Sequence, residues 1–299
     1  MNKLKIILTI ITIAAVVSMG GFCSLALAQS SKVIKVGYTA PFTGAAAEFG
    51  TNGWRGVQLA LEDINKKGIQ VNDTTYKIEI IRYDSVCKPT EAVANVRRLI
   101  MEDKVVAILG DHCSSCCLAI APLCDDFKIP GLTVECMADD ITSPGHPFYF
   151  RIYIPSGLIA VWLAPVIKEK LHPERVAFLG INDDYGRSHN EGISEELAKL
   201  GVKTVAKEYY ERGTTDYYVL LSKIMKANPD IVVFVGVTPE AGMALRQARE
   251  IGLVPRVRWL GSVESSEEEI LEKVGPEMVE GTYAWAVWGE VPGQLVRRV

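Results

Sequence analysis

The sequence predicts an α/β protein built as two lobes, each a doubly wound parallel sheet. Segments with the pattern of strands alternate with segments of helical pattern almost without a break. Several strand segments are short and wholly apolar, as expected where helices cover both faces of a parallel sheet. The 299 residues hold too many such units for one compact sheet, so we expect two lobes.

The first run of elements begins with a strand at Val33–Tyr38. Thr51 can cap the following helix, in which Val57, Leu61 and Ile64 recur at the spacing of one buried stripe. The further elements of this run are a strand over 77–83, a helix after Pro89, a strand over 105–109, a helix over 114–127 and a strand over 129–134. The order favours right-handed crossovers, which place helices on both faces of the sheet.

The alternation restarts after Arg151, which predicts the second lobe. Ser156 caps a helix that runs to Leu171, and Pro165 should kink it. Strands are then predicted over 175–181, 205–210, 231–237, 257–261 and 281–288, with helices over 185–200, 217–226, 238–252 and 265–274. We place the boundary near 153–155, between a lobe over 29–153 and a lobe over 154–278.

The N-terminus has the pattern of an export signal. Two lysines precede an apolar run from Ile6 to Val17, and Ala26-Leu27-Ala28 supplies the small residues of a cleavage site. The apolar run is short for a membrane span, and the bulky Phe22 before Cys23 disfavours lipid attachment. We therefore expect cleavage after Ala28, removal of residues 1–28, and export to the periplasm.

Composition and motifs exclude several classes of protein. The chain is 48% hydrophobic with a net charge of -4, which excludes a disordered chain and disfavours a nucleic-acid partner. No G-x-S-x-G, H-E-x-x-H or P-loop motif occurs, and the 4 histidines are scattered. We expect no enzyme, no cofactor and no metal site.

Six stretches, spread over nearly the whole chain, carry a resemblance to a known family. They are Val36-Gly37-Tyr38-Thr39-Ala40-Pro41, Gly44 to Gly50, Asp84-Ser85-Val86-Cys87, Gly110 to Ser115, Asp183-Asp184-Tyr185-Gly186 and Leu245-Arg246-Gln247-Ala248-Arg249. In order and spacing they resemble the periplasmic branched-chain amino-acid-binding proteins, the type I solute-binding proteins of ABC importers. The resemblance runs from about Val33 to Trp288.

The resemblance implies a monomer whose two lobes, joined by a hinge, close on a small amino acid or organic acid and then meet an ABC permease. Members run several tens of residues further, so a C-terminal part is expected to be missing. Residues 279–299 are expected to re-enter the first lobe. An alternative use of the same fold is a ligand-sensing module that reports to a receptor.

The candidate ligand site begins at Gly110 to Ser115, between the end of a strand and the start of a helix. Ligands of open parallel sheets bind at this edge, and the free amides of a helix start attract a carboxylate. The resemblance implies that Ser114 contacts the carboxylate, whereas from sequence alone a helix cap is the commoner role of such a serine. The resemblance implies further contacts at Phe49, Ser115, Glu135, Met137, Tyr185, Val237 and Glu264.

Two of these positions depart from the family pattern. Met137 stands where members have a threonine hydroxyl for the amino-acid head group, and Val237 stands near a missing aromatic residue. These changes put an α-amino acid in question, although Glu135 or Glu264 could still hold a cation.

The cysteines allow a structural and a redox interpretation. The resemblance implies a disulfide between Cys87 and Cys113. Cys113 and Cys116 also form a C-x-x-C at a helix start, the arrangement of exported thiol-disulfide oxidoreductases. A metal site in this cluster is disfavoured by its spacing. Cys117, Cys124 and Cys136 are expected to pack as small apolar residues or to form one further bridge.

Overall fold

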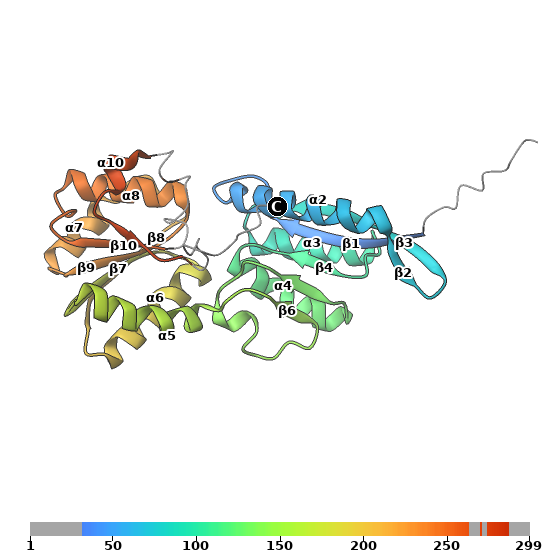
Figure 1. Ribbon diagram of the computed structural model, residues 1–299, viewed down its shortest axis with the longest axis horizontal. Coiled ribbons are helices and arrows are strands. Elements are labelled where there is room, and N and C mark those ends of the chain that lie inside the picture. Colours follow the sequence, from blue (N-terminus) through green and yellow to red (C-terminus); the bar gives the residue numbers. More distant parts are fainter. Residues whose placement is uncertain (1–31, 263–269, 271–273, 287–299) are drawn as a thin grey trace, which may run out of the picture.

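The computed structural model describes residues 32–262, 270 and 274–286. They form two halves that lie side by side, each with a central sheet flanked by helices (Figure 1). The predicted signal peptide at 1–28 and most of the predicted helix over 265–274 lie outside the described residues. Among the described helices, none has the length and apolar character that a membrane crossing requires.

The first sheet has 6 strands in the order β2-β3-β1-β4-β5-β6. All neighbouring pairs are parallel except β2 and β3, which pair antiparallel. The strands are β1 (Lys32–Ala40), β2 (Ile69–Val71), β3 (Thr74–Asp84), β4 (Ile108–Gly110), β5 (Gly131–Thr133) and β6 (Tyr149–Arg151). The helices of this half are α2 (Ala47–Lys67), α3 (Pro89–Met101), α4 (Ser114–Phe127) and the 3-10 turn η1 (Asp139–Ile141).

The second sheet has 5 parallel strands in the order β11-β10-β9-β7-β8. They are β7 (Arg175–Ile181), β8 (Lys203–Tyr210), β9 (Ile231–Val235), β10 (Arg258–Gly261) and β11 (Tyr283–Ala284). The helices are α5 (Ser156–Val166), the π-helical turn η2 (Ile167–Leu171), α6 (Asp184–Lys199), α7 (Tyr218–Lys226), α8 (Thr238–Glu250) and α10 (Pro276–Val279). The predicted α/β fold with two parallel-sheet lobes is confirmed.

Strand β11 corrects one boundary. Tyr283 and Ala284 pair with Leu260 and Gly261 at the edge of the second sheet, whereas the sequence predicts that residues 279–299 re-enter the first lobe. The free edge of β10 offers backbone partners to the strand that follows it, so this strand joins the second sheet. The lobe boundary near 153–155 stays a prediction.

The second half is covered on both faces, as a doubly wound sheet requires. One core packs Leu179, Phe234 and Trp259 against α7 and α8, and the other packs Phe178 and Val233 against α5 and α6. Successive residues of a strand point to opposite faces, so both faces of β7 and β9 are buried.

Among the described residues, the buried core of the first half lies at α3 and α4. The predicted buried stripe on α2 is wrong: Val57 and Leu61 are only half-buried, and Ile64 is 39% exposed. Thr51 lies inside this helix and does not cap it. An apolar stripe is buried only where a second layer covers it, and α2 contributes Phe49, near its start, to this core.

Asp139 links the two halves at their junction. Its carboxylate accepts hydrogen bonds from the Ser188 hydroxyl at 3.1 Å and from the Gly157 amide at 3.0 Å. The first half is thereby tied to α6 and to the start of α5.

Candidate functional site

A cavity of about 280 Å³ lies between the two halves, and both contribute to its walls. It sits where the strand ends β4, β7 and β9 lead into helices, the edge at which open parallel sheets bind ligands. The predicted residues in its wall are Phe49, Ser114, Glu135, Met137, Tyr185 and Val237. The wall also contains residues that were not predicted as ligand contacts, namely Glu48, Asn52, His112, Cys113, Tyr153, Asp183 and Arg212.

The two remaining predicted residues are placed elsewhere. Ser115 lines a neighbouring cavity of about 690 Å³, which shares Asp183 and Arg212 with the first. Glu264 lies outside the described residues.

Ser114 is the first residue of α4, and Cys113 occupies the cap position, so Ser114 is not the helix cap. Its hydroxyl oxygen accepts hydrogen bonds from the amides of Met137, at 3.2 Å, and Ala138, at 3.3 Å. A serine oxygen has two lone pairs and one proton. Both lone pairs are used here, and none of the described residues accepts the proton. The hydroxyl is therefore left with one donor at the cavity wall.

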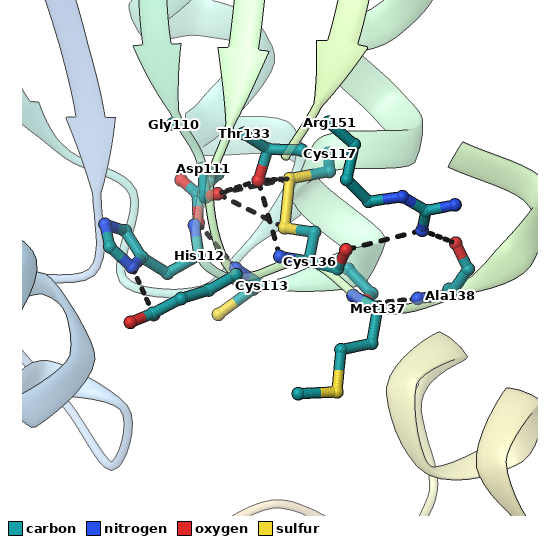
Figure 2. The surroundings of a disulfide bond; sticks show 12 residues. Gly110, Asp111, His112, Cys113, Cys117, Thr133, Cys136, Met137, Ala138 and Arg151 are labelled. Carbon is teal, nitrogen blue, oxygen red and sulfur yellow. Dashed lines mark hydrogen bonds and ion pairs between the residues drawn. A yellow bond between two sulfur atoms is a disulfide. The ribbon is translucent and has the colours of Figure 1, made fainter. Parts of the chain in front are cut away.

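The segment that carries Glu135 and Met137 is fixed by a disulfide and by Arg151. A disulfide joins Cys136 to Cys117 on α4, and the Arg151 guanidinium donates to the carbonyls of Cys136, at 3.4 Å, and Ala138, at 2.7 Å. Figure 2 shows this arrangement beyond the strand ends, with the Met137 side chain extending away from the disulfide. These contacts leave the segment little freedom to move at the cavity.

Glu135 is oriented by a buried chain of hydrogen bonds. Its carboxylate lies 2.5 Å from Nδ1 of His112, whose Nε2 lies 2.6 Å from the Tyr38 hydroxyl. A carboxylate only accepts, so Nδ1 donates to it, and in the neutral imidazole Nε2 accepts from the tyrosine. Burial raises the pKa of Tyr38, which keeps its proton. Glu135 itself is 37% exposed and presents a carboxylate to the cavity.

Gly53 makes room for this chain on the facing helix. A β-carbon at this position would lie 2.3 Å from Cε1 of His112 and 2.8 Å from the Tyr38 hydroxyl oxygen. Any side chain at residue 53 would therefore displace the imidazole that orients Glu135.

Arg212 is the cation of the cavity wall, and it follows the carboxyl end of β8. Its Nη2 donates to Oδ2 of Asp183 at 2.5 Å, while Oδ1 of Asp183 accepts from the Gly186 amide at 3.0 Å and caps α6. Nη1 of Arg212 is buried and has no hydrogen-bond partner among the described residues. No motif marks this arginine in the sequence. The one available signal was its position directly after a predicted strand.

The cysteine network supports the structural interpretation. The structure joins Cys87 to Cys113, the pairing that the resemblance implies, with Cα atoms 5.7 Å apart. Cys116 and Cys124 are buried free thiols, and burial raises the pKa of both. The C-x-x-C hypothesis is not supported, because Cys113 is already bonded and a reactive thiol needs a lowered pKa. Within the described ranges, no cluster of histidine, cysteine and acidic residues is arranged to hold a metal.

Comparison with known proteins identifies the family. The sequence profile of the family described as "Periplasmic binding protein" matches residues 33–297. An "Amino acid binding protein" of Pseudomonas aeruginosa is 34% identical over 89% of the chain, and the Leu/Ile/Val-binding protein of Escherichia coli K12 is 30% identical over 87%. The chain spans 69% and 68% of their lengths.

A solved structure agrees with these relatives. The leucine-binding protein of Thermotoga maritima superposes with a TM-score of 0.75 at 28% identity, covering 83% of this chain and 68% of that protein. The chain belongs to the periplasmic binding protein family, as the sequence resemblance predicted.

Proposed function

We propose that the protein is the extracytoplasmic solute-binding component of an ABC importer and captures a small carboxylate-bearing solute between its lobes. The observation that carries this proposal is the cavity at the start of α4, walled by both halves. Free amides at the helix start and the unused Ser114 proton provide donors for a carboxylate. A branched-chain amino acid or a similar molecule is the expected solute, in line with the names of the relatives.

Capture follows from the shape of the site. A solute touches the walls of both lobes only when these are close together, so it favours the closed form by its difference in affinity for the two forms. The closed form is then recognised by the permease. The binding protein acts as an exported monomer, and the solute leaves chemically unchanged.

The departures at Met137 and Val237 shape the solute class. Both residues line the cavity, and both are buried. They supply apolar surface where the resemblance implies a hydroxyl and an aromatic ring. Glu135 provides a carboxylate for an ammonium group, so an amino acid remains the first candidate.

Isothermal titration calorimetry of leucine, valine and leucinamide against the wild type and Ser114→Ala tests the proposal. Leucinamide lacks the carboxylate, so it should bind much more weakly than leucine. Loss of the serine donor should lower the affinity for leucine by about 10-fold or more, the range for a hydrogen bond to a charged group. Ser143→Ala is the matched control, since this serine is exposed and its hydroxyl bonds only to Asp140, at 3.2 Å, among the described residues.

Two outcomes would contradict this proposal. Equal affinity for leucine and leucinamide would show that the protein does not recognise the carboxylate. An absence of binding by amino acids and by short organic acids alike would remove the proposed solute class.

A further inference from the structure

Arg212 lines the cavity and carries a hydrogen-bond donor for which the described residues provide no acceptor. Its Nη1 is buried, and none of the described residues accepts its protons. A guanidinium stays charged at every relevant pH and carries five N–H donors in a rigid fork. A buried polar atom without a partner is rare in folded proteins and calls for an explanation, such as a group that is not present.

The Arg212 guanidinium is held in place by Asp183. Asp183 accepts from Nη2 at 2.5 Å and is itself fixed by the Gly186 amide, so Nη2 is held in position while the buried Nη1 has no partner among the described residues. Arg212 comes from the second lobe, and Ser114 comes from the first, yet both line the same cavity. A solute that satisfies both donors must therefore carry acceptor atoms at two separate places.

The charges around Arg212 decide which kind of acceptor fits. Asp183 already pairs with the guanidinium, and Glu240 lies close enough to interact with it electrostatically. Glu240 is buried and accepts from the Gly213 amide at 2.8 Å and the Tyr210 hydroxyl at 3.0 Å. The cavity wall also includes Glu48 and Glu135. A second full negative charge on the solute would meet an excess of acidic side chains, whereas an uncharged oxygen would not.

We propose that Arg212 selects solutes that carry, besides the carboxylate, an uncharged oxygen acceptor such as an amide or carbonyl group. This inference rests on the proposed function and narrows its solute class from apolar amino acids toward polar ones. Binding of such a solute gives Nη1 the partner that the described residues do not provide.

Solutes of the same shape that differ only in their terminal group test whether Arg212 prefers an uncharged oxygen acceptor. Leucine, asparagine and aspartate share their branching and end in an apolar group, an amide and a carboxylate. The same series without the ammonium group is 4-methylpentanoate, succinamate and succinate. Calorimetric titration of the purified protein should give the amide member of each bound series about 10- to 100-fold tighter affinity than the apolar member, since a hydrogen bond to a charged donor forms.

Arg212→Met should remove this preference by replacing the guanidinium with an apolar side chain of similar length. Arg187→Met is the matched control. Arg187 lines the neighbouring cavity, not the binding cavity, and its guanidinium lies 4.6 Å from the Tyr209 ring. The control should keep the wild-type order of affinities. Arg212→Lys, which keeps the charge and loses the fork, serves the same purpose if the methionine variant does not fold.

The outcomes separate this inference from the proposed function. If the apolar member binds as tightly as the amide in the wild type, or Arg212→Met changes the order no more than Arg187→Met, the inference is wrong and the proposed function stands. Tightest binding of aspartate or succinate would also overturn it, because the acceptor would then be charged. If none of the six solutes binds, both proposals fall.

Discussion

Val233 and Phe234 are neighbours on β9 of the second lobe, and their side chains point to opposite faces of the sheet. Both are fully buried, because helices cover each face. In the first lobe, Leu59 and Ile64 on α2 are 56% and 39% exposed, and the buried core lies on the side of α3 and α4. The same α/β pattern is thus filled by apolar packing to different degrees in the two lobes.

The cysteines are concentrated in the first lobe, which has the smaller share of buried apolar packing. Every cysteine after Cys23 lies between residues 87 and 136, in the first lobe, and the sequence has none beyond. Two disulfides join Cys87 to Cys113 and Cys117 to Cys136, so each ties α4 to a neighbouring loop. Cross-links restrict the unfolded chain and can stabilise a lobe whose described core is one-sided. Among the described residues, the first lobe thus combines two cross-links with a core on one side of its sheet, whereas the second lobe is packed on both faces.

Among the changes considered, reduction of both disulfides should cause the largest difference in stability between the two lobes. The bonds close loops with sequence separations of 26 and 19 residues, and each is expected to contribute about 3 kcal/mol in the chain-entropy model. Hydrogen-exchange mass spectrometry with and without a reductant should show faster exchange in α4 and β5, with β7 and β9 unchanged. Equal acceleration in both lobes would contradict the comparison.

A pair of leucine truncations sharpens the contrast in packing. Leu245 on α8 is 2% exposed, whereas Leu59 on α2 is 56% exposed. Leu245→Ala should lower the free energy of unfolding by about 2 to 5 kcal/mol, because it leaves a cavity in the second core. Leu59→Ala serves as its matched control and should change stability by about 0.5 kcal/mol or less. Urea unfolding measures both, and similar losses would mean that α2 is covered.

Acid should act on the second lobe through His189. Burial lowers the pKa of this imidazole to about 4, below the value of about 6.5 for an exposed histidine. Between these values the unfolded chain binds more protons than the folded one, so stability falls as the pH falls through this window. The contribution is present above about pH 6.5, and its loss approaches about 3 kcal/mol near pH 4.

Urea unfolding of the wild type and His189→Gln at several pH values between 7 and 4 measures this effect. The wild type should lose more stability than the variant over the same range, since glutamine does not titrate. Parallel curves for the two proteins would show that His189 does not contribute to the acid sensitivity.

Local pattern was sufficient for most of the elements. The sequence predicts the bounds of α4 and β7 as the structure has them, because a cap position, an apolar stripe or a short apolar run is a local property. Pro165 is the next-to-last residue of α5, and the π-helical turn η2 begins at Ile167. The expected kink stays a prediction. The place of Ser114 at a helix start beside the cavity follows from the same local order.

What the sequence by itself determined is the fold class, the family and the strand-to-helix turn that forms one wall of the site. Tertiary structure decided the rest, because burial and pairing depend on which distant segments meet. His112 contacts Tyr38 across a separation of 74 residues. Arg212 carries an unpaired donor beside the cavity because Asp183 pairs with Nη2, while the buried Nη1 has no acceptor among the described residues. The same dependence on a covering layer left α2 exposed, although its sequence carries the stripe of a buried helix.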